Sequence, residues 1–438
     1  MLESMLNAFR APDIRKRLLF VLGILVIYRA LAHVLIPGIN PAVLNSSATD
    51  NGFFGLLSLF SGGDIRQMSI VGLGLNPYIN ATIIMQILQS TIPSLQALSR
   101  EGEYGRNKIT SYSRYLSVPL AALQAYGILA YLQATEAASG ITAYTVPFGF
   151  GKYESLTMIL ALTTGSIVLM WLGELITEKG IGNGISFIIF AGIVSRIPAT
   201  VGQFLASPDW LELFAFGIVG LVIIFVIIFV QEGQRRIPIQ YANRVRGHRI
   251  YQGGSTFLPL RVNMAGVIPI IFAISILLFP YQIASYFTTS QVGWVKDLST
   301  GVVSWLSTTG PLYLSLYFLL TFAFAFFYTF IVFKPDETAN NLRKSGGFIP
   351  GIRPGQPTEE YLHRVALRIT VAGAIFVASI AVLPMVIAAL PLFKNLSNAG
   401  IGVGLGGTSV LIVVSVVVET MKQLEAQLMM RSYEGFIR

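Results

Sequence analysis

The chain has 438 residues, of which 54% are hydrophobic and only 12% are charged, and its formal net charge is +9. Soluble domains carry about 25% charged residues, so this composition leaves too little polar surface for a water-soluble protein of this size and predicts an integral membrane protein. The sequence has no cysteine and only three scattered histidines. These features exclude a disulfide scaffold and a thiolate metal site, and we expect no metal and no other cofactor.

Ten apolar runs are long enough to cross the hydrocarbon core of a bilayer, which is about 30 Å thick. They lie near residues 18–37, 70–91, 112–133, 154–174, 184–204, 211–231, 262–283, 311–333, 367–390 and 402–419. Ten spans place both termini on one side of the membrane. With Arg29 of the first span set aside, the side opposite the termini holds only five of the basic residues, Arg66, Lys152, Arg196, Lys296 and Lys394. By the positive-inside rule we expect an all-α, multi-pass protein with cytoplasmic N and C termini.

The second span is too short to cross the membrane as a helix. Asn76 followed by Pro77 predicts an N-cap and a helix start, and Pro93 predicts an end near Thr91. Such a helix is about 22 Å long. Just upstream, an apolar half-helix over residues 53–60 ends in a Ser-Gly-Gly sequence. We expect this re-entrant piece to be buried in the bundle and to cap a cavity; a hairpin lying on the lipid headgroups is the alternative.

The fifth span is also weak. It follows the sequence Gly182-Asn183-Gly184, and its apolar run over residues 185–194 stops at Arg196. Broken or short spans often mark the transport path of a membrane protein. The isoleucines of this run fit ordinary helix packing equally well.

The spans offer little for catalysis or for ion coupling. Arg29 and His33 lie in the first span, while Glu174, Glu232 and Glu419 fall at predicted cytoplasmic ends. A proton- or sodium-coupled carrier places an ionisable group near the bilayer midplane. The sequence also shows no nucleotide-binding loop and no hydrolase motif. We therefore expect a passive conduit that is not an enzyme; an ion-coupled secondary transporter of small solutes is the alternative, because broken helices occur in both classes.

Two basic loops of about thirty residues, 233–260 and 333–365, lie on the predicted cytoplasmic side. A loop that only sets orientation can be far shorter, so their length predicts docking of an anionic partner such as an acidic protein or RNA phosphate. The candidate contact residues are the arginines Arg235, Arg236, Arg244, Arg246, Arg249 and Arg353. Arg353 precedes a Pro-Gly turn that would place it at a loop tip.

Five motifs, in order along nearly the whole chain, closely resemble the SecY/Sec61 family of protein-conducting channels. They are Leu73-Gly-Leu-Asn-Pro-Tyr-Ile79, Gly180-Ile-Gly-Asn-Gly-Ile-Ser186, Val262-Asn-Met-Ala-Gly-Val-Ile-Pro269, Lys344-Ser-Gly-Gly-Phe-Ile-Pro-Gly-Ile-Arg-Pro-Gly355 and Gly406-Gly-Thr-Ser409. The resemblance implies ten helices in two pseudo-symmetric halves of inverted topology, here residues 1–204 and 205–438. These halves would hinge between the fifth and sixth spans and close around an hourglass pore.

The resemblance also implies roles for individual residues. A plug of about residues 53–68 would include Phe53, Phe54, Leu57, Phe60, Gly62, Gly63, Asp64 and Arg66. An aliphatic ring at the pore constriction falls on Leu75, Ile79, Ile185, Ile189, Ile271 and Ile412, where Leu75 departs from the isoleucine of bacterial relatives but stays aliphatic. A lateral gate between the second and seventh spans would use Asn80, Thr82, Gln86, Phe279 and Ile283.

The implied function is passive translocation of unfolded preproteins across the bacterial plasma (inner) membrane, with lateral release of membrane segments into lipid. Because the sequence shows no ATP site, the resemblance implies that a SecA motor ATPase or a ribosome docked on the basic loops supplies the driving force. The small SecE and SecG membrane subunits, preprotein signal sequences and the lipid bilayer are the other expected partners.

Overall fold

A computed structural model describes residues 12–39, 68–139, 153–195, 197–198, 202, 210–241, 244–246, 249–251, 254–288, 292–306, 310–388 and 407–437. Its helices are α2 (Pro12–Leu31), α5 (Asn76–Thr91), α6 (Pro93–Arg100), α7 (Glu103–Ser139), α8 (Tyr153–Lys179), α9 (Gly184–Val194), α11 (Trp210–Glu232), α12 (Ile268–Phe287), α13 (Gly293–Trp305), α14 (Pro311–Val332), α15 (Pro335–Ser345), α16 (Gln356–Ala388) and α19 (Gly407–Ile437). Its strands are β1 (Gln234–Tyr241), β2 (Arg244–Arg246), β3 (Arg249–Tyr251), β4 (Ser255–Arg261) and β5 (Gly347–Phe348).

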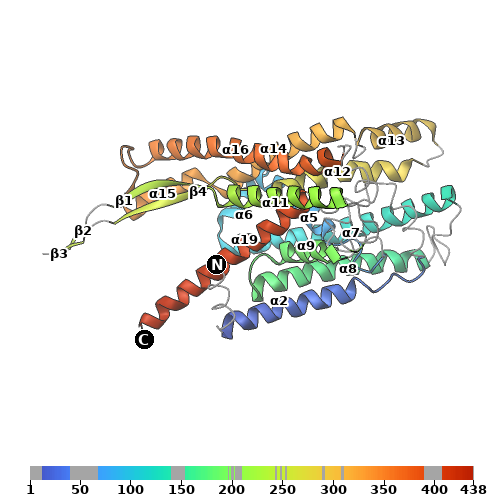
Figure 1. The fold of residues 1–438 in the computed structure, drawn as a ribbon, viewed down its shortest axis with the longest axis horizontal. Coiled ribbons are helices and arrows are strands. Elements are labelled where there is room, and N and C mark those ends of the chain that lie inside the picture. Colours follow the sequence, from blue (N-terminus) through green and yellow to red (C-terminus); the bar gives the residue numbers. More distant parts are fainter. Residues whose placement is uncertain are drawn as a thin grey trace.

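Most helices run side by side along the long axis of the molecule, with the strands gathered at one end and α13 at the other (Figure 1). We call the end with the strands the sheet end. The ten predicted spans overlap, in chain order, the helices α2, α5, α7, α8, α9, α11, α12, α14, α16 and α19. The mainly helical fold expected from the sequence is therefore confirmed. All ten helices contribute to one large hydrophobic cluster inside the bundle.

The outer surface of the bundle is apolar, as a lipid environment requires. On α11, for example, Phe214, Leu221, Phe225 and Phe229 are exposed. Three described helical segments, Tyr153–Lys179, Pro311–Ser345 and Gln356–Leu383, meet the length and hydropathy of a membrane-crossing helix. Several others are apolar but shorter, and these include Gly184–Val194.

Helix α5 begins and ends where the sequence predicts, but Asn76 is not its N-cap. The capping position is Leu75, which already has a helical backbone conformation, and no side chain caps the helix. The Ile79 N–H donates to the Leu75 carbonyl at 2.9 Å, and Asn76 is a buried residue of the first turn. The chain thus enters the helix one residue early, because the preceding turn already aligns Leu75 with the helix.

Helix α9 is shorter than the predicted fifth span, since it stops at Val194. Its start is fixed by the side chain of Asn183, whose Oδ1 accepts hydrogen bonds from the N–H groups of Ile185 (3.0 Å) and Ser186 (3.4 Å). This is an ordinary asparagine N-cap. Gly184 contacts α8 so closely that an added Cβ would lie 1.9 Å from the Gly173 carbonyl oxygen.

The two long basic segments are not separate loops, which corrects their description from the sequence. Strand β1 pairs antiparallel with β4 from Gln234↔Arg261 to Gln240↔Ser255, and its other edge pairs with β5 at Gln240↔Phe348 and Tyr241↔Gly347. The sheet order is β4-β1-β5. Because β5 comes from the second segment, one small sheet joins both segments and adds a β element to a helical fold.

A separate hydrophobic cluster lies under this sheet and holds it to α15 and α16. Its buried members are Ile237, Ile239, Leu260, Ala339, Leu342, Ile349, Leu362 and Val365. Strand β1 alternates accordingly, with Ile237 and Ile239 buried and the intervening residue exposed. We call the sheet, α15 and the first turns of α16 the sheet unit.

Leu362→Ala should loosen the sheet unit, because Leu362 is fully buried where α16 meets the strands. Truncating a buried leucine costs about 2–5 kcal/mol. The expected result is faster tryptic cleavage after Arg235 or Arg236, which lie in β1 and are protected while the strand is paired. Leu367→Ala is the matched control, since Leu367 lies on the same helix and is 41% exposed. Equal cleavage rates for both variants would contradict this assignment of the cluster.

Candidate functional site

A cavity of about 460 Å³ lies within the bundle and is lined by residues of α5, α9, α11, α12, α14 and α19, together with β4 and the turn that follows it. Its aliphatic lining includes Ile79 of α5, Ile185 and Ile189 of α9, and Ile271 of α12. These are four of the six predicted ring residues. The cavity therefore lies where segments far apart in the sequence converge.

The other two predicted ring residues, Leu75 and Ile412, are fully buried and are not part of the cavity lining. They belong to the same hydrophobic cluster as Ile79 and Ile189, against which Ile185 and Ile271 pack. The structure thus brings all six predicted residues into one apolar cluster. Four of them line the cavity, and the other two are buried within the cluster.

The cavity lining also includes polar side chains of α11 and α19, whose contacts were not found by sequence reasoning. The Gln231 amide donates to the Ser415 hydroxyl, and Lys422 forms an ion pair with Glu232 at 2.8 Å. Both contacts join α11 to α19. The sequence places Glu232 at the end of its span but gives no partner for it, because Lys422 is 190 positions away along the chain. Glu419 and Arg261 also line this part of the cavity.

The predicted gate residues lie on two helices, α5 and α12, that contact each other. Thr82 and Gln86 line the cavity, and Asn80 is half-buried. The Thr82 hydroxyl donates to the Tyr78 carbonyl at 2.8 Å, so its polarity is satisfied within its own helix. On α12, Phe279 and Ile283 are 38% and 37% exposed. Thr82 and Gln86 therefore face the cavity, while the α12 residues lie partly at the outer surface.

The predicted docking arginines all fall at the sheet end. Arg235 and Arg236 are exposed on β1. Arg244, Arg246 and Arg249 belong to the β2–β3 hairpin, which pairs at Arg244↔Tyr251 and Arg246↔Arg249. Arg353 is exposed in the turn between β5 and α16, where its carbonyl accepts a hydrogen bond from the Thr358 hydroxyl at 2.8 Å. The predicted plug residues Phe53 to Arg66 lie outside the described residues.

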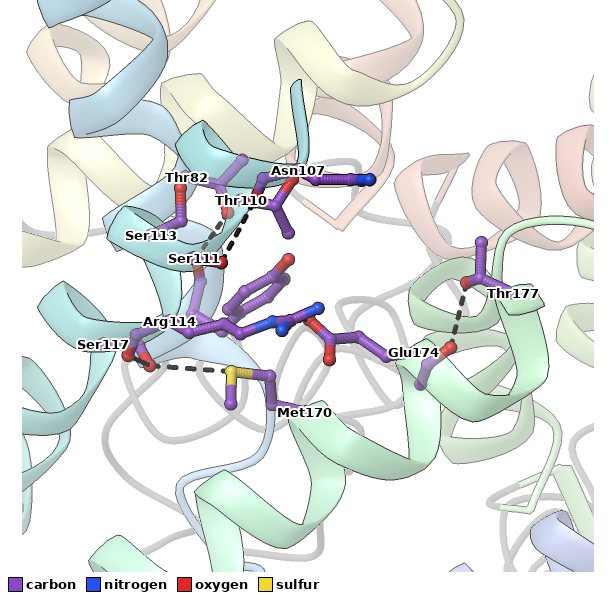
Figure 2. A network of polar contacts seen from close by, with 12 residues as sticks. Thr82, Asn107, Thr110, Ser111, Ser113, Arg114, Ser117, Met170, Glu174 and Thr177 are labelled. Atoms are coloured by element: carbon purple, nitrogen blue, oxygen red, sulfur yellow. Dashed lines mark hydrogen bonds and ion pairs between the residues drawn. The ribbon is translucent and has the colours of Figure 1, made fainter. Parts of the chain in front are cut away.

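Polar contacts join α7 to α8 (Figure 2), and both helices contact α5. Arg114 Nε donates to Glu174 Oε1 at 2.6 Å, and the Ser117 hydroxyl contacts the Met170 sulfur at 3.6 Å. Tyr78 of α5, which lines the cavity, is close enough to both charges to interact with them electrostatically. Helix α5 also packs against α7. The joined pair α7–α8 is therefore the support on which the short helix α5 rests.

Apolar helices packed around an internal cavity, with isoleucines of three helices in its lining, define a multi-pass membrane protein. The SecY family model matches residues 69–421. The chain is 44% identical over 450 residues to protein translocase subunit SecY of Streptomyces scabiei, and 42% identical over 452 residues to that of Mycobacterium leprae. Both alignments cover 100% of each chain.

Solved structures show the same fold at low sequence identity. A protein conducting channel superposes with a TM-score of 0.61 at 17% identity, and a SecY structure concerned with the plug domain with 0.62 at 19%. Canine Sec61 in a ribosome–channel complex gives 0.60 at 18%. Each comparison covers 93% of this chain and 91% of the other. The chain belongs to the SecY family.

The Arg114–Glu174 ion pair should stabilise the bundle measurably, because the Glu174 side chain is only 23% exposed. Arg114→Met is expected to lower the thermal unfolding midpoint in lipid nanodiscs, with a pairwise coupling of about 0.5–1 kcal/mol in a double-mutant cycle with Glu174→Gln. The exchanged pair Arg114→Glu with Glu174→Arg should recover part of the loss. Lys334→Met, which removes the exposed Lys334–Glu337 pair, is the control. Zero coupling at Arg114 would contradict the expectation.

Proposed function

We propose that this chain is a passive protein-conducting channel that translocates unfolded preproteins across the bacterial plasma membrane and releases membrane segments sideways into lipid. One observation carries the proposal. Isoleucines of three helices line the cavity, including four of the six predicted ring residues, and the other two ring residues belong to the same hydrophobic cluster. The membership of the chain in the SecY family supports the same conclusion.

The chemistry of such a constriction suits a substrate of variable sequence. A pore that must pass chemically unlike side chains cannot rely on specific hydrogen bonds, whereas a collar of apolar side chains excludes water and closes around whatever passes. Leu75, Ile79, Ile185 and Ile189 come from the proposed half 1–204, and Ile271 and Ile412 come from the proposed half 205–438. The constriction therefore lies between the halves, so their separation would widen it.

The seam between α5 and α12 is the proposed lateral gate. On α5, Thr82 and Gln86 line the cavity and Asn80 is half-buried, and Gln86 Oε1 is buried without a partner among the described residues. An unpartnered buried polar atom weakens the packing around it. A signal helix entering the seam would replace this imperfect contact, and each Leu or Ile that it places at mid-membrane favours insertion by about 0.3–0.6 kcal/mol.

The sheet unit is the proposed docking surface, and it lies on the cytoplasmic side together with both termini. Arg235, Arg236 and Arg353 are all exposed on the sheet unit, in which β1 pairs with β5. A SecA-type motor ATPase or a ribosome would dock there; the canine Sec61 and yeast Ssh1 structures that resemble this chain are ribosome complexes. SecE and SecG are the proposed small subunits, and the segment 53–68 is the proposed plug.

Cysteines at Asn80 and Phe279 test the gate, and the absence of native cysteine makes the experiment clean. A disulfide between Asn80→Cys and Phe279→Cys should block both export of a preprotein and insertion of a membrane segment, because α5 and α12 can then no longer separate. Reduction should restore both activities. Each single variant under the same oxidation is the control. A crosslinked channel that exports and inserts as well as its reduced form would show that the gate lies elsewhere.

Arg353→Glu tests docking. Reversal of an exposed charge at the tip of the sheet unit should strongly reduce motor-driven export from proteoliposomes, while the thermal unfolding midpoint stays the same. Lys296→Glu is the matched control, because Lys296 is exposed on α13 at the opposite end of the molecule. Normal ATP-dependent export by the Arg353→Glu channel would show that Arg353 is not part of the docking surface.

A further inference from the structure

The two proposed gate helices begin in the same way, although they are far apart in the sequence. Helix α5 is preceded by Gly74 and has Pro77 in its first turn, and α12 is preceded by Gly266 and has Pro269 at the same spacing. Both glycines have a left-handed backbone, with φ of 61° and 66°. The capping residues Leu75 and Val267 both have a helical conformation and no side-chain cap. We call residues 68–75 and 262–267 the lead-in segments.

The two helix starts also place one isoleucine each, at equivalent positions, in the cavity lining. Ile79 follows Gly74 by five residues, and Ile271 follows Gly266 by five residues. Both isoleucines line the cavity. Their N–H groups donate to the carbonyls of the two capping residues, at 2.9 Å in α5 and 3.4 Å in α12. The position of each isoleucine is therefore set by the lead-in segment before it.

Each lead-in segment lies against a glycine of a later helix. A Cβ added to Gly165 of α8 would lie 2.1 Å from the carbonyl oxygen of Ile70. A Cβ added to Gly373 of α16 would lie 2.3 Å from the carbonyl oxygen of Val262. Ile70 precedes Gly74 by four residues, and Val262 precedes Gly266 by four residues. Real Cβ atoms do not approach a backbone oxygen this closely, so any larger residue must push the segment away.

Other contacts hold each lead-in segment in place. In the first, the Ser166 hydroxyl donates to the Gly74 carbonyl at 2.9 Å, and an antiparallel bridge joins Ser69 to Leu35. In the second, the Val262 N–H donates to the Gly233 carbonyl at 2.9 Å, and the Asn263 side chain bonds both polar backbone groups of Gly266. These bonds hold both lead-in segments in place. A displacement of a segment at its glycine contact is therefore expected to move the start of the helix that follows.

We infer that Gly165 and Gly373 are positioning residues of the constriction. Each lets one lead-in segment approach its supporting helix, and thereby sets where Ile79 or Ile271 stands in the cavity wall. This inference rests on the proposed channel function, because it assigns the two glycines to the seal of the idle channel. The same arrangement then occurs in both proposed halves: α8 supports the segment before α5, and α16 supports the segment before α12.

Gly165→Ala and Gly373→Ala test the inference in the complete translocon reconstituted in planar bilayers. Each is expected to raise the ion conductance of the idle channel severalfold, because one isoleucine of the collar is displaced, and the double variant should leak more than either single variant. Gly220→Ala on α11 and Gly23→Ala on α2 are matched controls, since an added Cβ meets nothing within 4 Å at either position. Their conductance should equal that of the wild type.

Ser166→Ala covers the case in which an alanine variant fails to fold, because it removes the bond to Gly74 without adding volume. It should leak in the same direction but less, whereas Ser315→Ala, at an exposed serine of α14 that bonds only within its own helix, should not. Folded variants that lose thermal stability with unchanged idle conductance would overturn the inference and leave a packing role. A wild-type chain that fails to translocate a preprotein would instead refute the proposed function, which a translocation assay in the same vesicles measures separately.

Discussion

The structure depends on one constraint: backbone N–H and C=O groups inside a membrane must find partners within the protein. A conduit needs interrupted helices, and each interruption leaves such groups without helical partners. Residues 68–75 meet the constraint through a bridge to Leu35 and a bond from Ser166. Asn183 does the same for the start of α9. The breaks that shape the cavity are therefore possible only because neighbouring helices surround and bond them.

Both polar and apolar side chains line the cavity. Side-chain bonds such as Gln231–Ser415 and Lys422–Glu232 join α11 to α19 beside it. Isoleucines of α5, α9 and α12 contribute the aliphatic part of the lining. In the proposed channel, neither set of side chains selects one substrate sequence, which suits the passage of an unfolded chain.

In the sheet unit, two basic segments that the sequence presents as separate loops form one structure. Two basic stretches, about a hundred residues apart, form the single sheet β4-β1-β5 over a shared hydrophobic cluster. Exposed Arg235, Arg236 and Arg353 thus belong to one sheet unit. The first turns of α16 belong to the same cluster, and α16 also contacts the lead-in segment of α12 through Gly373.

Composition and local pattern were enough to predict the membrane environment, a mainly helical fold and the bounds of α5, because lipid leaves few choices for an apolar chain. The six aliphatic residues were instead suggested by the resemblance of the motifs to the SecY/Sec61 family. The sequence alone could not show that Lys422 pairs with Glu232, that Arg114 pairs with Glu174, or that the two basic segments share a sheet, since each depends on residues far apart along the chain. Nor could it show why Gly165 and Gly373 must lack side chains. That requirement arises only where a helix meets the backbone of a distant segment, and only the tertiary structure decides where that is.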